Sequence, residues 1–564
     1  MKIVKRDGHM VDYDASKIEN AIEKANLEVT NNEKASKKEI AEIIYYIEHL
    51  KKKRILVEDI QDIIEEKLME LGKYKLAREY ITYRYTRELV RKANTTDQTI
   101  KELIEGKSIY LNEKELGKNV ELVTSQRNAI AGITSADITR RFLLPEDIVN
   151  AHDEGLIYFH SSDYFAQNAL SNCEVINLAD MLQNGTIING VKIDKPKRFI
   201  EAATITSQII LEVMASSYGG ATISASHLAP FVRDSYEIYY KKYKLKGISD
   251  KEAEKNAKED TKNEIKDGIN IIIYQISLLQ NLANPTSKVS INLYLNETWV
   301  YKDELALVIE TFLNQSVTRY ADSKLPKVDN TYKFVYVLEE DNINENCKYW
   351  YLTKLAKECV TNEIQFIPEK RMKEMLKEEN GNIKYYGRFN QGIVTVNLAD
   401  VAISSDKIIE KFWNVLDERL ELCHRALQIR HKRLSNVTSN VAPILWQNGA
   451  IARLKEGETI HNLLHHGYST LTLGFAGLDE CISYMTESDQ DELKLQEKVI
   501  QYLQYAIKKW REAEDIEYNL YSTVDETINS RLVQCIKEKN GEVKGITDKN
   551  KLSNVMYNDA TDLI

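Results

Sequence analysis

Residues Ala151–Val232 read AHDEGLIYFHSSDYFAQNALSNCEVINLADMLQNGTIINGVKIDKPKRFIEAATITSQIILEVMASSYGGATISASHLAPFV, the most informative stretch of the chain. A single cysteine, Cys173, follows Asn172 and precedes a short apolar run, Val175–Leu178, that is typical of a buried strand. An isolated cysteine in such a place is most often a small core residue. The residues around Cys173 must therefore decide whether it has a chemical role.

Outside this stretch, apolar strand-like runs alternate with long amphipathic helices. The strand candidates are Val289–Leu295, Phe334–Leu338, Ile393–Leu398, Val441–Trp446 and Leu471–Phe475, and the helices between or after them include Ile408–Ile429 and Gln490–Glu512. Alternation of this kind is typical of an α/β barrel or sheet with buried strands. The sequence therefore predicts an α/β fold for the larger part of the chain.

The composition of the 564 residues suits a globular protein, with 43% hydrophobic and 29% charged residues. The net charge is −10, so no basic patch favours nucleic acid as a partner. Six widely scattered cysteines are typical of reduced thiols in the cytoplasm. No run of 18 apolar residues and no signal peptide is found, so we expect a soluble cytoplasmic protein without membrane contact.

The first 95 residues form a unit of their own. Two short extended runs, Lys2–Arg6 and Met10–Tyr13, flank an Asp7-Gly8 turn suited to a hairpin. Four helices are predicted after them: one carries Ile18 and Ile22, a second begins near Ser36, a third carries Ile60 to Leu68 and a fourth Ala77 to Arg84. The prediction is a small hairpin with four helices.

The quoted stretch resembles the opening of the catalytic barrel in the anaerobic, class III ribonucleoside-triphosphate reductases. The motifs HDEG, FH..DYFAQ, NC..INL.DMLQNGT, S.YGG and HLAPFV occur in the family's order and spacing. Later landmarks also match in order: QRNAIAGITSADITRRFLLPEDIVN from Gln126, Gly387–Ala402, Ser439–Ala450, Ser469–Glu480 and Leu520–Thr527. The resemblance implies a ten-stranded α/β barrel over 120–564 that reduces ribonucleoside triphosphates for DNA precursor synthesis, with a homodimeric state and a radical-SAM activating enzyme.

The resemblance also implies roles for particular residues. Cys173 matches the first-strand cysteine, a redox partner of the radical cysteine beside the substrate ribose. Asn390 corresponds to an active-site asparagine whose amide can bind a ribose hydroxyl. The turn Tyr521-Ser522-Thr523 resembles a substrate-phosphate loop, where hydroxyls and N–H groups at a helix start meet the anion. We expect no metal, because no acidic ligand or general base accompanies His461, His465 and His466.

The N-terminal unit, 1–95, resembles the ATP-cone, an allosteric nucleotide-binding domain of ribonucleotide reductases. The motifs VKRDG, KI, VEDIQDIIEEKLM and A.EYI.YR match in order. The implied site for ATP or dATP as allosteric effectors comprises Val4, Lys5, Arg6, Asp7, Gly8 and Lys17, because the cations can neutralise a triphosphate. The polar residues 96–119 are expected to form a linker to the barrel.

Two departures from the family stand out. No cysteine lies between Cys359 and Cys423, where the family has the finger-loop cysteine that carries the thiyl radical. No CxxC and no R..GY loop occurs either, so the zinc site and the radical glycine expected for the family are absent and the barrel reads as truncated at its C-terminus. The chain is then an incomplete or split reductase, with a separate glycyl-radical polypeptide, or a catalytically inactive nucleotide-binding regulatory paralogue.

Overall fold

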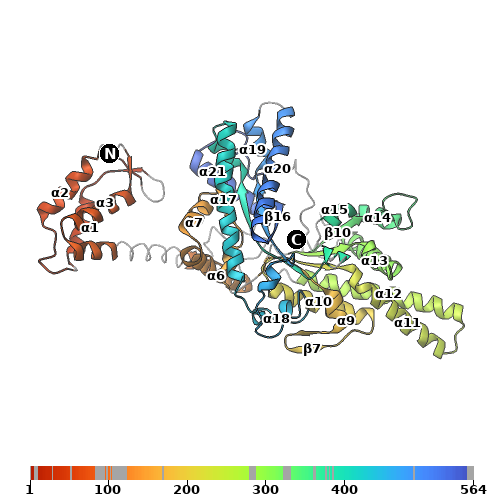
Figure 1. Cartoon of the computed structure of the whole chain (residues 1–564). Coiled ribbons are helices and arrows are strands. Elements are labelled where there is room, and N and C mark those ends of the chain that lie inside the picture. Colours follow the sequence, from red (N-terminus) through yellow and green to blue (C-terminus); the bar gives the residue numbers. More distant parts are fainter. Residues whose placement is uncertain are drawn as a thin grey trace. The chain divides into compact units, whose positions relative to one another are not determined.

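The computed structural model contains two compact units, Met1–Ser108 and Ile109–Ile564, which are described separately (Figure 1). The residues that the structure describes are 2–4, 10–27, 29–50, 54–82, 96, 99–101, 103–104, 123–167, 171–278, 288–321, 332–359, 364–374, 378–379, 382–383, 386–486 and 489–554. Among them no helix qualifies as a candidate for crossing a membrane.

The N-terminal unit is a small sheet with helices packed on it. The predicted hairpin is confirmed: β1 (Lys2–Val4) pairs antiparallel with β2 (Met10–Asp12). The sequence did not indicate a third strand, β3 (Arg54–Leu56), which pairs parallel with β1. A strand of three residues that pairs only with β1 is too short to show a hydrophobic periodicity in the sequence.

Three helices of this unit begin near their predicted places and share one core. They are α1 (Ser16–Leu27), α2 (Lys37–Glu48) and α3 (Val57–Glu70). A capping box begins α2, because Ser36 accepts from the Glu39 N–H while the Glu39 carboxylate accepts from the Ser36 N–H. The fully buried core side chains are isoleucines and leucines at helical spacing, among them Ile22, Ile43, Ile47, Ile64 and Leu68.

The larger unit is built on one mixed sheet. Nine described strands form it, eight in the order β11-β10-β9-β8-β5-β14-β15-β16, while β4 pairs with β14. Their bounds are β4 (Ile157–Phe159), β5 (Glu174–Val175), β8 (Ala221–Ser224), β9 (Val289–Leu293), β10 (Tyr332–Leu338), β11 (Ile364–Pro368), β14 (Arg388–Asn397), β15 (Ser469–Ala476) and β16 (Glu517–Ser522). The strands β5, β8, β9, β10 and β11 run parallel to one another, and so do β14, β15 and β16. The two sets meet antiparallel at β5 and β14.

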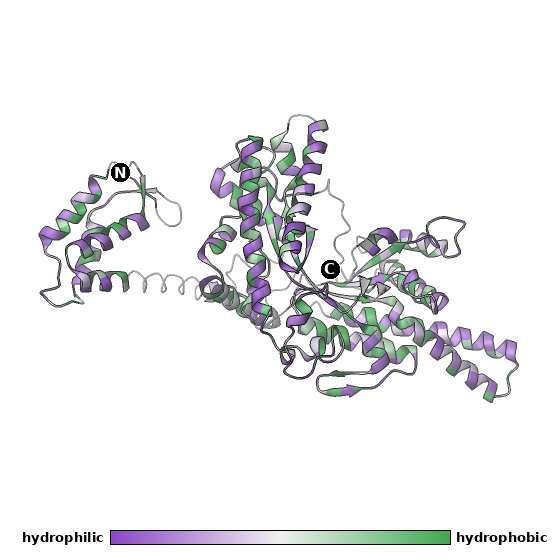
Figure 2. Cartoon of the chain, viewed as in Figure 1, coloured by the Kyte–Doolittle hydropathy of each residue, from purple (hydrophilic) through white to green (hydrophobic). Residues whose placement is uncertain are grey.

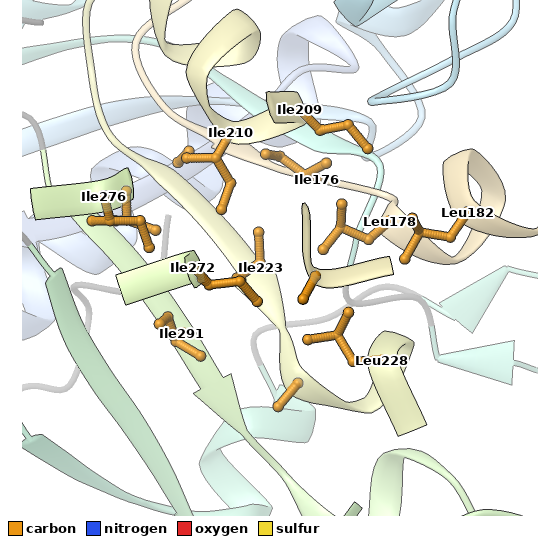
Figure 3. Close-up of a cluster of buried hydrophobic side chains, with 14 of the residues drawn as sticks. Ile176, Leu178, Leu182, Ile209, Ile210, Ile223, Leu228, Ile272, Ile276 and Ile291 are labelled. Atoms are coloured by element: carbon orange, nitrogen blue, oxygen red, sulfur yellow. The ribbon is translucent and has the colours of Figure 1, made fainter. Parts of the chain in front are cut away.

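Helices cover one face of the first set of strands. In Figure 3, Ile223 of β8 and Ile291 of β9 lie close to Ile272 and Ile276 of α12 (Asp250–Leu278), with Ile210 of α10 (Phe199–Ala215) beside them. These side chains are almost completely buried. Burial of each such side chain contributes about 1.5–3 kcal/mol, so this face of the sheet is a main source of stability.

A second core covers β14, β15 and β16. The helices α17 (Ile409–Leu434) and α20 (Asp489–Glu514) pack on these strands, as predicted from their periodicity. Hydrophilic and hydrophobic residues alternate along both helices in Figure 2, which is the amphipathic pattern of a helix on a sheet. The prediction of buried strands is confirmed by β15, whose residues are all buried.

The prediction of a strand at Val441–Trp446 is wrong. Residues Pro443–Trp446 form a short helix, α18, with Pro443 in its first turn. The indole of Trp446 is buried and packs edge-on against Phe389, with 4.9 Å between ring centroids. A short apolar run does not distinguish a strand from a buried helix turn, and the proline is suited to the helix start.

The predicted strand Val175–Leu178 is also shorter than expected. The strand β5 ends at Val175, and α9 (Leu178–Asn184) already begins at Leu178. Asn177 ends the extended segment because its side-chain oxygen accepts a hydrogen bond from the Asp180 N–H and so caps the helix. A polar capping residue inside an apolar run thus decides where the strand stops.

We predict that Gly268→Val in α12 destabilises the protein. A Cβ at Gly268 would lie 2.9 Å from the Phe199 ring and 3.0 Å from the Ala203 Cβ, so any larger side chain forces α10 and α12 apart. Overpacking of this kind costs about 1–3 kcal/mol. Denaturant midpoints should fall accordingly, whereas Lys258→Ala at an exposed position of the same helix should leave them unchanged. Equal midpoints for both variants would contradict the prediction.

Candidate functional site

At its centre the sheet has one apolar and one polar face, and the polar face carries Cys173 and Asn390; on β10 and β11 the same face is apolar. Side chains alternate along each strand, so Ile223, Ile291 and Phe389 lie toward the hydrophobic core. The residues between them point the other way. The strand register places these polar-face residues side by side: Cys173, Thr222, Ser224, Ser290, Asn292, Arg388, Asn390, Thr470 and Thr472.

Cys173 and Asn390 lie opposite each other where the two sets of strands meet. The Asn390 N–H donates to the Cys173 carbonyl at 2.8 Å, and the Asn172 N–H donates to the Asn390 carbonyl at 2.8 Å. Residues directly opposite in an antiparallel pair present their side chains to the same face. The structure therefore brings together two predicted site residues that are 217 positions apart (390 − 173 = 217).

Hydrogen bonds to residues of β14 and β15 hold the Asn390 side-chain amide in place. Its Nδ2 donates to the Thr470 and Thr472 hydroxyls at 3.1 and 2.7 Å, and its Oδ1 accepts from the Gly392 N–H at 2.8 Å. Asn390 is 0% exposed. Both amide protons are therefore in use, and Oδ1 also accepts from the Asn172 Nδ2 at 3.4 Å. A ribose hydroxyl that donates to Oδ1 would have to replace this long contact.

A glycine allows the next loop to approach Cys173. A Cβ at Gly219 would lie 1.4 Å from the Asn172 carbonyl oxygen and 2.8 Å from the Cys173 Sγ. No side chain fits at that distance. The S.YGG motif is thus explained by close packing of the Ser217–Gly220 turn against the cysteine.

The predicted phosphate loop lies at the end of β16. Tyr521 and Ser522 are the last residues of that strand, and the Thr523 hydroxyl lies 2.8 Å from the Thr395 hydroxyl. Two features differ from the open anion site that the sequence suggested. The Thr523 N–H already donates to the Phe475 carbonyl at 2.9 Å, and Asp525 caps the first N–H groups of α21 (Glu526–Asn540).

The Ser522 hydroxyl lies on the other face of the sheet, because Ser522 pairs with Phe475 and follows Leu520 on the apolar side. It is buried and has no hydrogen-bond partner among the described residues.

Two residues near the site were not among those predicted from the sequence. His160 contacts the Thr395 hydroxyl at 2.7 Å, and burial, helped by the Arg430 cation, lowers its pKa to about 3, so its imidazole is neutral. Arg430 of α17 donates to the Tyr218 hydroxyl at 3.0 Å and stacks on Phe159. His160 stands in the FH..DYFAQ motif, but no motif marks Arg430, which only the packing of α17 brings to the site.

Little of the predicted effector site falls within the described residues. Val4 ends β1, Lys5 to Gly8 lie outside the described residues, and Lys17 lies in the first turn of α1. The Lys17 side chain is 71% exposed and 3.9 Å from the Asp14 carboxylate. An exposed ammonium with one weak surface partner is available to a phosphate.

Comparison with known proteins shows similarity along almost the whole chain. A family model described as anaerobic ribonucleoside-triphosphate reductase matches residues 118–563, and one described as ATP cone domain matches residues 1–89. Anaerobic ribonucleoside-triphosphate reductases of Haemophilus influenzae and Escherichia coli strain K12 are each 29% identical to this chain. The matches span 99% of the chain, 82% of the Haemophilus protein and 81% of the Escherichia protein.

Solved structures show the same fold. The anaerobic ribonucleotide reductase of Thermotoga maritima with glycerol in its active site has a TM-score of 0.59 at 12% identity, over 83% of this chain and 80% of that one. Its complex with dATP and CTP gives 0.59 at 15% identity, with the same coverage. The predicted α/β fold of this type, preceded by a small helical unit, is confirmed. Ten strands were predicted, and the described residues form nine in the main sheet.

We predict that Glu174→Gln makes stability less dependent on pH. Glu174 is fully buried on the apolar face, and burial raises its carboxyl pKa from 4.5 to about 7, only partly offset by the Ser171 hydroxyl. Between these values the unfolded chain loses the proton first, so stability falls as pH rises. The Gln variant avoids this loss, and it should be more stable than the wild type by about 3 kcal/mol at pH 8 and little different at pH 4. Denaturant titrations at both pH values test this, and an equal difference at both would refute it.

Proposed function

The chain belongs to the anaerobic ribonucleoside-triphosphate reductase family, and from this premise we propose that its barrel binds a ribonucleoside triphosphate with the ribose at Cys173 and Asn390. The observation that carries the proposal is the pairing of these two residues across β5 and β14. A thiol and an amide oxygen on one buried polar face can meet the hydrogens and hydroxyls of one sugar.

We propose that the triphosphate lies at Tyr521, Ser522 and Thr523. The support is the position of this turn at the end of β16, where Tyr521 and Thr523 lie on the polar face and the Thr523 hydroxyl is 2.8 Å from the Thr395 hydroxyl. The strands β14, β15 and β16 run parallel, and their carboxyl ends are where α/β sheets bind phosphates. The loop therefore holds the anion while the strands position the sugar.

The sequence lacks the cysteine that carries the thiyl radical in the family. No cysteine occurs between Cys359 and Cys423, a stretch that includes the connection from β11 to β14 and would carry the thiyl radical in the family. We propose that a separate polypeptide supplies the glycyl radical, which a radical-SAM activating enzyme generates on it; this polypeptide does not account for the missing finger-loop cysteine. The same absence favours the alternative of a regulatory paralogue that binds nucleotides without reducing them.

We propose that residues 1–95 form the allosteric unit, that 96–119 link it to the barrel at 120–564, and that ATP and dATP are its ligands. The proposed contacts are Val4, Lys5, Arg6, Asp7, Gly8 and Lys17. The relative in the Thermotoga structure is bound to dATP and CTP, which supports nucleotide effectors here. A cytoplasmic homodimer remains part of the proposal.

We predict that ATP or dATP stabilises the N-terminal unit. Ligand at about 100 times its dissociation constant should add about 2.7 kcal/mol. Calorimetry and thermal unfolding of the full chain measure the effect. The double variant Lys5→Ala with Arg6→Ala should lose it, because the phosphate charge is no longer neutralised, while exposed Lys37→Ala in α2 should keep it. A shift that survives the double substitution would exclude the proposed site.

We predict that the chain by itself does not convert CTP to dCTP, even anaerobically with a radical-SAM activase. Hydrogen abstraction from ribose needs a thiyl radical held in contact with the sugar, and Cys173 occupies the partner position rather than the radical position. Product analysis with electron paramagnetic resonance tests this. Turnover by the chain alone that Cys173→Ala abolishes would overturn the prediction and make Cys173 the radical site. Turnover only after a glycine-bearing polypeptide is added would support the split enzyme over the regulatory paralogue.

A further inference from the structure

A pair of buried polar side chains lies at the carboxyl ends of β8 and β9. His227 is in the short 3₁₀ helix Ala225–Leu228 that follows β8, and Glu297 ends the 3₁₀ helix Leu295–Glu297 that follows β9. Their side chains are 5% and 7% exposed, and the His227 Nε2 is 3.6 Å from the Glu297 Oε1. That separation is too long for a hydrogen bond, so the two groups do not satisfy each other.

Several polar atoms of this pair have no partner among the described residues. They are both ring nitrogens of His227 and the Oε1 of Glu297. The other carboxylate oxygen accepts from the Ser224 hydroxyl, and the Tyr386 ring packs edge-on against His227 at 4.5 Å. Most buried polar groups in folded proteins have hydrogen-bond partners, so a cluster of exceptions indicates that a further molecule completes it.

The pair lies on the same polar face as Cys173. In the register of β5 and β8, Cys173 stands level with Gly220, and Ser224 follows four residues later. At 3.3 Å per residue, Ser224 is about 13 Å further along the strand. The phosphate loop lies in the opposite direction, because β14 to β16 run antiparallel to β5 and Tyr521 pairs with Gly474, four residues beyond Thr470.

The positions of these groups along the strands define the orientation of a bound nucleotide. A nucleotide with its phosphates at Tyr521–Thr523 and its ribose at Cys173 points its base toward His227 and Glu297. The distance of about 13 Å must accommodate the sugar, the base and one hydrogen bond of about 3 Å. Arg388 lies between, opposite Val175 on the same face, and its Nε and Nη1 also lack partners among the described residues. These donors suit a carbonyl oxygen of the base.

We propose that His227 and Glu297 form the subsite that recognises the nucleobase of the substrate. The proposal rests on the proposed function, since it needs the ribose at Cys173 and the phosphates at the end of β16. A nucleobase is planar, uncharged and edged with donors and acceptors. It can therefore satisfy the imidazole nitrogens and the carboxyl oxygen together without bringing a charge into the interior.

The electrostatics of the pair fit several bases. Burial lowers the pKa of His227 to about 3 and raises that of Glu297 to about 7. At neutral pH the imidazole is uncharged and offers one donor and one acceptor, and the carboxyl group can do either as its proton comes or goes. The edges of the four bases differ in their order of donors and acceptors. Groups that can serve in both roles suit an enzyme that accepts more than one ribonucleotide.

The test compares nucleotides with and without a base. Affinities for CTP and for ribose 5-triphosphate are measured by calorimetry on the full chain. The Lys5→Ala and Arg6→Ala substitutions are included so that the N-terminal unit does not contribute. We expect CTP to bind more tightly than ribose 5-triphosphate. Glu297→Met and His227→Phe should each reduce that advantage about 10-fold, the usual worth of a good base contact.

Two matched variants separate recognition from loop damage. Glu297→Gln keeps a donor and an acceptor and should retain the CTP advantage, and exposed Asp303→Asn should not alter it. An unchanged advantage in both Glu297→Met and His227→Phe would overturn the subsite. The subsite would also be overturned if affinity for ribose 5-triphosphate fell as much as affinity for CTP, because this would indicate that the end of the barrel had collapsed. Failure of the parent protein to bind either compound would instead refute the proposed function itself, and the subsite with it.

Discussion

The antiparallel junction between β5 and β14 is the constraint on which the rest of the larger unit depends. Two 2.8 Å backbone hydrogen bonds join Cys173 to Asn390 and Asn390 to Asn172. They bring two sets of parallel strands into one sheet, so the carboxyl ends of the two sets lie at opposite ends of the polar face. A thiol at the middle of that face therefore has carboxyl ends of strands on either side of it.

Burying a polar face costs free energy, and hydrogen bonds within the face offset part of that cost. Thr470 and Thr472 hold the Asn390 amide, and Thr395 holds Thr523. Each buried polar atom left without a partner costs about 1–3 kcal/mol. On this face, side-chain atoms of His227, Glu297 and Arg388 have no hydrogen-bond partner among the described residues. The stability needed to tolerate them comes from the opposite face, where β8 and β9 pack on α10 and α12 (Figure 3).

Much of the fold could be read from the sequence, because periodicity and capping are local. Helical spacing of apolar residues marked α2, α17 and α20. Errors arose where a short apolar run had two possible conformations. Val441–Trp446 satisfies a strand pattern, yet Pro443 and the burial of Trp446 against Phe389 make it a helix. No local signal could reveal β3, whose only pairing is with β1.

The sequence by itself determined the family, the two units and the identity of Cys173 and Asn390 as candidates, because ordered motifs survive in a one-dimensional string. Tertiary structure decided which side chains meet. His227 and Glu297 are 70 residues apart (297 − 227 = 70), and Arg430 reaches Tyr218 only because α17 packs on β14. Strand register sets these encounters, and register depends on hydrogen bonds between distant segments that no local pattern encodes.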